Sequence, residues 1–167
     1  MSTLNTITSS SVAIDQDQVY ASQRADKQKI ISIYKYNDIW TKIHSFKVAD
    51  MDSYGTLIVK NNQIKSCIWE EHQISVFSTS GQLLQICGSH SIGEASKLNY
   101  PTLCQEDEFN AILFADFGND ALKILKNVEQ FSLMSLHPQV KFPMGAAIFR
   151  SKLYVSSRSK NKLYLYV

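Results

Sequence analysis

The feature that most limits the fold of this chain is an internal repeat. Residues 112–125, ILFADFGNDALKIL, align without a gap with residues 153–166, LYVSSRSKNKLYLY, 41 positions later. The apolar positions coincide, whereas the polar centres FGND and RSKN differ. An earlier pair, ISIY at 31–34 and ISVF at 74–77, follows the same frame, so four copies are spaced by 43, 48 and 41 residues. Units of this length bury their apolar sides against neighbouring units, because one unit cannot do so alone.

Within each copy the apolar residues follow the period of a β-strand. Segments such as KIISIYKY (29–36) and HQISVFS (72–78) alternate or run apolar, and they are rich in β-branched and aromatic residues, which is typical of half-buried strands. Turn-forming sequences separate these segments, for example STSG at 78–81 and DFGN at 116–119. The pattern predicts an all-β chain of four-stranded antiparallel units, and at this repeat length such units are β-propeller blades.

We expect a single β-propeller domain over residues 1–167, since this length suits one hydrophobic core. The four predicted blades cover approximately 10–47, 53–90, 99–137 and 142–167. The last blade lacks its outer strand, and residues 2–8 have a weak strand pattern that makes them a candidate closing strand. If the ring stays open, an exposed blade edge invites pairing with another chain.

The third and fourth copies resemble the NHL-repeat family of β-propellers. The family repeat starts with an aromatic-Pro-x-Gly motif, continues through a Val-Ala-Asp strand and a nearby Asn, and ends in a strand before a Gly-containing linker. The same order is found here in ISVFSTSGQLLQICG (74–88), Gly93, LNYP (98–101), ILFADFGNDALKIL (112–125) and FPMGAAIF (142–149). The match is good over residues 72–167 and loose over 10–71. Departures are Ala121, where the family often has Arg, Ser156-Ser157 in place of Ala-Asp, and the missing Pro-x-Gly motif in the first two copies.

This resemblance implies a binding module. NHL propellers usually have six blades, so four copies indicate part of a larger ring, with a small four-bladed ring as the alternative. In tripartite-motif ubiquitin ligases, the NHL domain selects the protein substrate or the RNA, while an upstream RING domain transfers ubiquitin. Three cysteines are too few for a RING or B-box within these 167 residues, so a ligase role would belong to a longer chain.

Charge and cysteine content narrow the classes of function. The formal net charge is only +2, which is a smaller basic excess than nucleic-acid-binding domains usually show. Cys67, Cys87 and Cys104 form no C-x-x-C pair, so we expect neither a disulfide framework nor a zinc site. The sequence has no signal-peptide pattern and no run of about 18 apolar residues. We therefore expect a cytoplasmic protein that has no membrane partner.

Binding residues are expected on the loops that join the second and third strands of each blade, because these loops lie together on one face of a propeller. The loops are QRADKQK (23–29), WEEHQ (69–73), DFGND (116–120) and SRSKNK (157–162). If the first and fourth blades meet, their basic side chains form one positive patch. The candidate binding residues are Arg24, Lys27, Lys29, Arg158, Lys160 and Lys162, together with Trp69 beside its acidic loop tip. Alternatively, the lysines only keep the surface solvated.

Candidate metal ligands and catalytic groups are sparse. Asp116, Asn119 and Asp120 resemble a calcium-ligand set, but the favoured interpretation is that Asp116 accepts backbone N–H bonds as a loop cap. The four histidines are scattered, without a second ligand at i+2 or i+4. We expect no metal, no cofactor and no catalytic residue.

These patterns together predict a non-catalytic interaction scaffold that binds a protein partner. Single-stranded RNA binding through the basic patch is the second candidate, because phosphate contacts supply affinity and unstacked bases supply specificity. A metal-dependent propeller hydrolase or lyase is the third. Self-association through an open blade edge is also expected if the ring is partial.

Overall fold

The described residues fold into four separate antiparallel sheets, as the repeat predicts. The computed structural model describes residues 9–25, 27–49, 55–88, 98–127, 130–134, 140–159 and 161–166. Blade 1 contains β1 (Ser9–Asp15), β2 (Gln18–Ala25), β3 (Gln28–Asn37) and β4 (Ile39–Ala49), and blade 2 contains β5 (Leu57–Lys60), β6 (Gln63–Ile68), β7 (Gln73–Ser78) and β8 (Leu83–Cys87). Blade 3 contains β9 (Pro101–Glu106), β10 (Ile112–Asp116), β11 (Ala121–Asn127) and β12 (Gln130–Met134), with a single 3-10 turn, η1 (Phe117–Asn119). Blade 4 contains β13 (Pro143–Phe149), β14 (Lys152–Ser157) and β15 (Lys162–Tyr166).

Each sheet follows the order of the chain, so within a blade each strand pairs with the strands next to it in sequence. Tight turns make this up-and-down pairing possible. Asn61 and Asn62, between β5 and β6, both have positive φ angles of 53° and 60°, the conformation that a two-residue hairpin requires and that Asn tolerates well. The fourth blade has three strands in the described part of the chain. The candidate closing strand at residues 2–8 lies outside the described residues.

The hydrophobic core is divided into three layers, one at each joint between consecutive blades. Ile31 and Ile64 lie in the layer between blades 1 and 2. Cys67 and Phe114 lie in the layer between blades 2 and 3, and the layer between blades 3 and 4 is built in the same way around Leu122 and Val155. Since adjacent sheets meet through side chains, each inner blade is buried on both faces, which is the packing predicted for repeated units.

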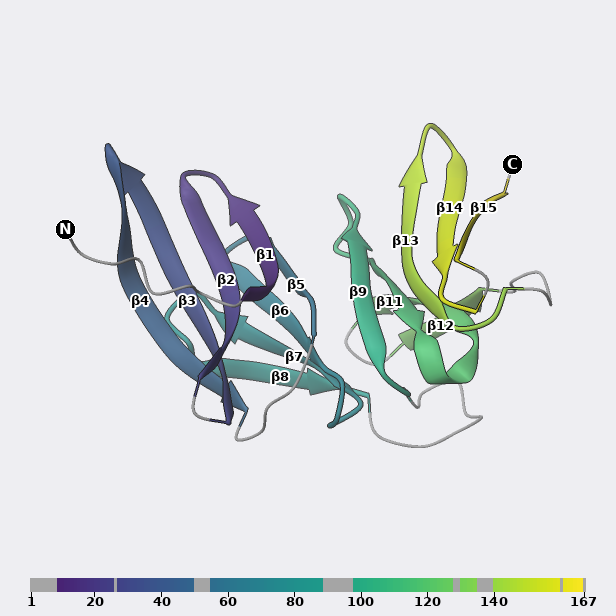
Figure 1. Ribbon diagram of the computed structural model, residues 1–167, viewed down its shortest axis with the longest axis horizontal. Helices are drawn as coiled ribbons and strands as arrows, with labels where there is room; N and C mark the ends of the chain where they lie inside the picture. Colours follow the sequence, from purple (N-terminus) through teal and green to yellow (C-terminus); the bar gives the residue numbers. More distant parts are fainter. Residues whose placement is uncertain are drawn as a thin grey trace.

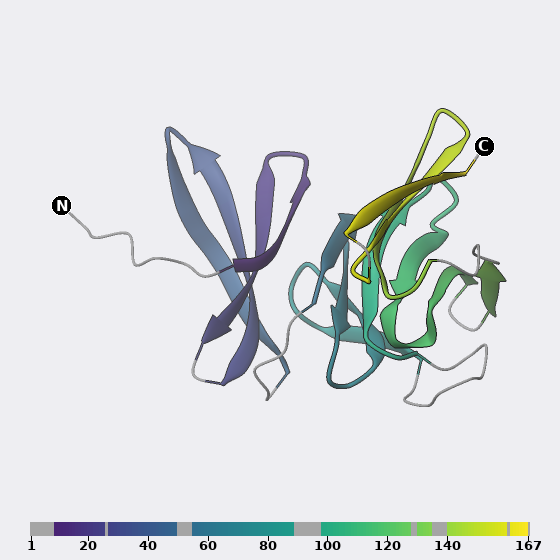
Figure 2. The same cartoon turned by 45° about the vertical axis from the view of Figure 1, so that its right-hand side comes forward.

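In the described residues, the four blades form an open arc (Figure 1). The first strands β1, β5, β9 and β13 follow one another along the inside of the arc, and the main contacts join consecutive blades. Blades 1 and 4 stand at opposite ends in both views (Figures 1 and 2). The basic loops of these two blades therefore do not meet within one chain, because the arc does not return on itself.

Among the described residues, two buried lysines reach across the blade joints. Lys65 of β6 forms an ion pair with Glu106 of β9 at 2.8 Å, and the two side chains are only 6% and 1% exposed. Lys29 of β3 donates a hydrogen bond to the backbone carbonyl of Cys67 at 2.7 Å.

The three cysteines are free thiols, and burial raises the pKa of the Cys104 thiol to about 11. Among the described residues, no helix has the length and hydropathy needed to cross a bilayer.

Candidate interaction face

Four aromatic side chains gather where the second-to-third-strand turns of blades 2 and 3 meet the starts of β9 and β13. We call Trp69, Tyr100, Phe117 and Phe142 the aromatic row. Trp69 follows β6 and Phe117 opens η1, whereas Tyr100 and Phe142 directly precede Pro101 and Pro143, the first residues of β9 and β13. The row therefore spans three blades on the face that carries the second-to-third-strand turns.

The rings of the aromatic row contact one another in sequence. Trp69 stacks on Phe117 with centroids 6.3 Å apart and an interplanar angle of 17°. Tyr100 lies edge-on to both rings, at 6.2 Å from Trp69 and 6.5 Å from Phe117. Phe142 lies 5.1 Å from Phe117. Such pairs are favourable beyond the area they bury, so the row is a rigid apolar surface.

Tyr100 and Phe142 occupy an unfavourable backbone conformation. Their φ angles are +54° and +51°, a left-handed conformation that costs a non-glycine residue about 1–2 kcal/mol. Both side chains remain substantially exposed, at 39% and 43%, so their own burial recovers only part of that cost. A strained backbone that presents an exposed aromatic ring is a pointer to function.

Asp116 holds the backbone before Tyr100 in place. Its carboxylate is fully buried and accepts a hydrogen bond from the backbone N–H of Asn99 at 2.6 Å. It also pairs with Lys123 at 2.7 Å and accepts a bond from the Asn119 amide at 2.8 Å. Asp116 thus accepts a backbone N–H bond, as expected, but it does not cap its own loop: its side chain makes no cap bond to η1, and the donor, Asn99, lies two residues before β9.

Asp120 plays the corresponding part for Phe142. Its carboxylate accepts the Phe142 backbone N–H at 2.8 Å and pairs with Lys141 at 3.0 Å. The Phe142 carbonyl in turn accepts the backbone N–H of Arg158 at 3.1 Å. The two acidic residues that resemble calcium ligands thus bind donors of the protein itself, and they fix both strained aromatics.

The predicted binding residues do not form one patch, since they are spread over blades 1, 2 and 4. Trp69 is part of the aromatic row, and the exposed Arg158 places its guanidinium 6.0 Å from the Phe117 ring. Lys162 is exposed at the start of β15. Arg24 lies in β2, and Lys27 is exposed in the turn that follows it. Lys160 lies outside the described residues.

Lys29 is wrongly placed by the sequence interpretation, which assigned it to an exposed loop. β3 begins at Gln28, so Lys29 belongs to a strand, and its side chain is 0% exposed. The connection is a tight hairpin turn, in which Lys27 takes a φ of +63°. Because the ammonium group is bonded to the Cys67 carbonyl between two blades, Lys29 is a structural residue of the joint.

Burial of Lys29 predicts a pH-dependent stability. Desolvation lowers the pKa of Lys29 in the folded chain, and the nearby Glu70 and Glu71 only partly oppose it. The unfolded chain therefore binds this proton more tightly, so the free energy of unfolding rises as the pH climbs through the folded pKa toward 10.5. We expect urea titrations at about pH 7 and about pH 10 to show a larger stability gain for the wild type than for Lys29→Met. An equal gain in both proteins would contradict the assignment.

Charge is distributed unevenly along the aromatic row. Glu70 is exposed and Glu71 partly exposed beside Trp69, whereas Arg158 adds positive charge at the Phe117 end. Lys141, near the same end, is paired with Asp120. The face is thus acidic at blade 2 and basic at blade 4, with apolar rings between them.

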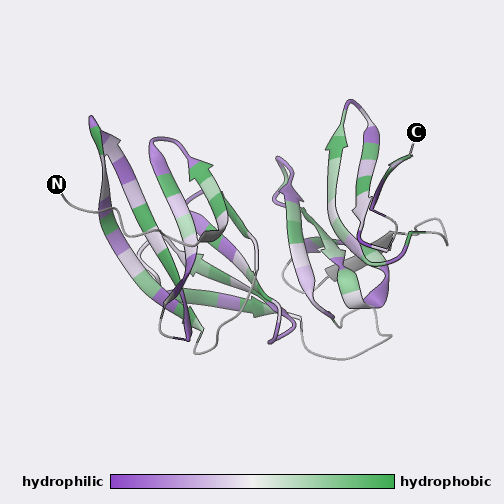
Figure 3. Cartoon of the chain, viewed as in Figure 1, coloured by the Kyte–Doolittle hydropathy of each residue, from purple (hydrophilic) through white to green (hydrophobic). Residues whose placement is uncertain are grey.

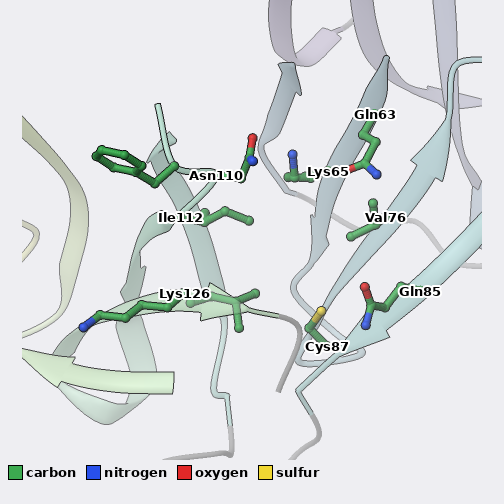
Figure 4. Close-up of a pocket in the computed structure, with 10 residues that line it drawn as sticks. Gln63, Lys65, Val76, Gln85, Cys87, Asn110, Ile112 and Lys126 are labelled. Carbon is green, nitrogen blue, oxygen red and sulfur yellow. The ribbon is translucent and has the colours of Figure 1, made fainter. Parts of the chain in front are cut away.

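A separate pocket opens between blades 2 and 3 (Figure 4), and its lining includes no residue of the aromatic row. Its volume is about 210 Å³, which is below the range of about 300–1,000 Å³ that is usual for small-molecule sites. Its basic groups are Lys65, which is already paired with Glu106, and Lys126. The lining residues are Gln63, Lys65, Val76, Gln85, Cys87, Phe109, Asn110, Ile112, Leu125 and Lys126. The aromatic row is the stronger candidate because it combines exposure, strain and charge.

Two of the four histidines, His44 and His72, lie within the described residues. His72 is buried, and its Nδ1 accepts the backbone N–H of Tyr100 at 3.1 Å, so it supports the aromatic row. His44 is exposed, with Nε2 3.1 Å from the carbonyl oxygen of Ser80. Within the described residues, no group of three or more His, Cys, Asp or Glu side chains is arranged to hold a metal ion.

Sequence reasoning missed Tyr100, Phe117 and Phe142 as site residues. The signal was present, because LNYP and KFPM each place an aromatic residue directly before proline. That pairing was interpreted as a marker of the repeat and not as a binding feature. The positive φ angles that expose the two rings depend on contacts with Asp116 and Asp120, which lie far away in the sequence.

Comparison with known proteins supports the fold. No known protein family profile matches the chain, and no curated protein matches it in sequence. Among solved structures, the chain is similar to a virginiamycin B lyase from Staphylococcus aureus crystallised with quinupristin, with a TM-score of 0.68, 10% identity, and coverage of 99% of this chain and 57% of the lyase. A nidogen/laminin complex gives a TM-score of 0.66 at 13% identity, covering 92% of this chain and 57% of the other.

A computationally designed protein, Ika4, is similar over almost its whole length. It covers 97% of this chain, which in turn spans 92% of the designed chain, with a TM-score of 0.65 and 12% identity. The natural propellers named above are spanned over little more than half of their length. The chain is thus a β-propeller of four blades, and the proteins that share its fold include both enzymes and binding proteins.

Proposed function

We propose that this four-bladed propeller is a non-catalytic scaffold that binds a protein partner through the aromatic row. The observation that carries the proposal is the pair of exposed aromatic residues, Tyr100 and Phe142, held in a strained backbone conformation by buried or bonded carboxylates. Trp, Tyr and Arg dominate the binding energy of protein interfaces, and all three residue types lie on this face. Because the rings are held in advance, a partner would bind with little further ordering.

The charge pattern favours a peptide segment over a nucleic acid. A single-stranded RNA also stacks its bases on aromatic rings, but its phosphates would be repelled by Glu70 and Glu71 beside Trp69. A peptide that carries a basic residue toward blade 2 and an acidic residue toward Arg158, with apolar side chains between them, matches the whole row. RNA binding stays the second candidate because Arg158 and Trp69 would suit it.

The finer classification of the scaffold is part of the same proposal. We infer an NHL-type propeller from the motifs at 98–101, 112–125 and 142–149. If the chain belongs to a longer protein with a RING module, the aromatic row would select the substrate of a ubiquitin ligase. The free thiols of Cys67, Cys87 and Cys104 suit the reducing cytoplasm.

Selection from a library of random dodecapeptides displayed on phage tests this proposal. Peptides enriched on the wild-type chain should lose at least about tenfold in affinity on Tyr100→Ala and on Phe142→Ala, as expected for hot-spot residues. Alanine keeps the Cβ and the backbone preference, so the substitutions remove only the rings. Phe109→Ala is the matched control, because Phe109 is 78% exposed on another hairpin.

A parallel measurement with fluorescent random-sequence single-stranded RNA separates the two candidates. Peptide binding that depends on both rings, and that weakens with salt far less steeply than RNA binding does, supports the proposal. RNA binding that is tighter than peptide binding, and that falls steeply as salt increases, would replace it with the second candidate. Peptides that bind all three variants equally would remove the aromatic row from consideration.

A further inference from the structure

The two ends of the arc carry exposed apolar sheet faces. The blade 1 end face contains Val12 and Ile14 of β1, which are 56% and 71% exposed, and the Tyr36 and Trp40 rings, which lie 5.1 Å apart. The blade 4 end face contains Phe149, Leu163 and Leu165, which are 59%, 68% and 50% exposed, together with Ala147 and Tyr154. Figure 3 shows hydrophobic positions alternating with hydrophilic ones along these terminal hairpins. Exposed patches of this kind mark interaction surfaces.

The end faces are the two halves of a standard blade joint. Counted from their turns, the β1–β2 and β13–β14 hairpins have the same register, so the pair Ala13 and Tyr20 corresponds to Ala147 and Tyr154. Ala13 and Tyr20 pack against blade 2, whereas Ala147 and Tyr154 occupy the same position on blade 4, where the described arc ends. The blade 4 end face is therefore a front face that still lacks the back face of a following blade.

The joint between blades 1 and 2 also shows which residues should meet when a blade 4 packs on a blade 1. By the same register, Leu165 corresponds to Ile33 of blade 1, and Ile14 corresponds to Val59 of blade 2. Ile33 and Val59 lie in one buried cluster at 2% and 9% exposure. Leu165 and Ile14 would form the equivalent contact if a blade 4 met a blade 1.

We propose that two copies of this chain close into one ring, in which the blade 4 end face of each copy packs on the blade 1 end face of the other. A second copy fits because a single chain carries both complementary halves, so one partner satisfies both ends. Two arcs also suffice for a circle, since the chain spans 57% of the length of natural propellers that it matches. Contacts between unlike faces give a closed assembly only when the rotation that relates one copy to the next completes a circle. Two copies that each form about half a ring meet that condition.

The area is adequate for a stable dimer. An end face is three or four strands wide, at about 4.8 Å per strand, and about five residues long, at about 3.3 Å per residue, which gives roughly 250–300 Å² of sheet plane. Each copy buries two such faces, and protruding side chains increase the accessible area beyond the plane. The total approaches the roughly 800 Å² per partner of a standard specific interface.

Sedimentation equilibrium of the 167-residue chain, run over a wide range of concentrations, tests the proposal. We expect the wild type to reach the mass of two chains and no more. Ile14→Lys and Leu165→Glu should each weaken the dimer by at least about 100-fold, since a buried unpaired charge disrupts both joints. Phe109→Lys is the matched control, because Phe109 is at least as exposed as Ile14 and Leu165 but lies on neither end face.

Mixing the two variants provides the decisive measurement. A mixed dimer of Ile14→Lys with Leu165→Glu has one unchanged joint and one joint in which Lys faces Glu, so association should be at least about tenfold tighter than for either variant alone. A dimer joined through like faces would show no such rescue. The absence of rescue in the mixture would therefore overturn the head-to-tail arrangement. A wild type that stays a single chain, or that grows without limit, would overturn the closed ring. Circular dichroism of each variant confirms that the exposed substitutions leave the fold intact.

Discussion

Replacing Glu106 with Gln should lower the free energy of unfolding by about 3–5 kcal/mol, because it leaves a buried ammonium group without its counter-charge. Lys65 and Glu106 join blades 2 and 3, with both carboxylate oxygens within hydrogen-bond distance of the Lys65 nitrogen, at 2.8 and 2.9 Å. Their side chains are 6% and 1% exposed, so the pair is largely shielded from bulk water, although Lys65 also lines the pocket between blades 2 and 3. Urea denaturation followed by circular dichroism measures the loss.

The double variant Lys65→Met with Glu106→Leu is the control for that measurement. It removes both charges and keeps similar side-chain volumes, and replacing a buried ion pair by apolar residues is often neutral or stabilising. We expect its stability to lie within about 1 kcal/mol of the wild type. A Glu106→Gln variant as stable as the double variant would show that water reaches this joint.

Gly55→Ala should destabilise the chain by about 3 kcal/mol or more, since overpacking against an immobile backbone is costly. A Cβ at Gly55 would overlap the backbone carbonyl oxygen of Cys67 and approach the Lys29 nitrogen. The same carbonyl accepts the hydrogen bond from Lys29, so relieving the overlap would also disturb the joint between blades 1 and 2. The midpoint of thermal or urea unfolding measures the effect.

Gly145→Ala is the matched glycine substitution. A Cβ there meets only the hydroxyl oxygen of Ser156 at 3.3 Å, and a side-chain hydroxyl can rotate away. We expect a change of less than about 1 kcal/mol. If Gly55→Ala were equally mild, the close approach at Cys67 would have to be relieved by a small backbone movement without loss of packing.

The strands could be predicted from the sequence because two independent patterns, the internal repeat and the two-residue apolar period, place them at the same positions. The segments 112–125 and 153–166 align without a gap, and they fold into hairpins of matching register, β10–β11 and β14–β15. Turn residues such as Asn61 and Asn62 mark the hairpins locally. Local chemistry therefore determines the blades.

The site was less predictable because it depends on contacts between residues that are distant in sequence. The sequence next to Lys29 does not reveal that its side chain will be buried between two blades with a hydrogen bond to the Cys67 carbonyl. Similarly, Tyr100 and Phe142 become exposed binding candidates only when Asp116 and Asp120 fix the backbone before each proline. Arg158 could be predicted as a loop cation, but its position beside Phe117 required the curvature of the arc. Whether the arc closes on itself also depends on that curvature, which no local pattern encodes.

The blade joints carry a consequence for how propellers of different size evolve. In two of the layers, the small side chains of Ala13 and Ala146 lie on inner strands, whereas the bulky rings of Phe46 and Tyr166 lie further out. Each of these two layers is therefore a wedge, and its taper contributes to the angle between neighbouring sheets, because interiors are packed without spare volume. Exchanging a few outer residues for larger or smaller ones would widen or narrow every wedge while leaving all strand hydrogen bonds in place. The circumference of the assembly is thus adjustable by side-chain volume alone.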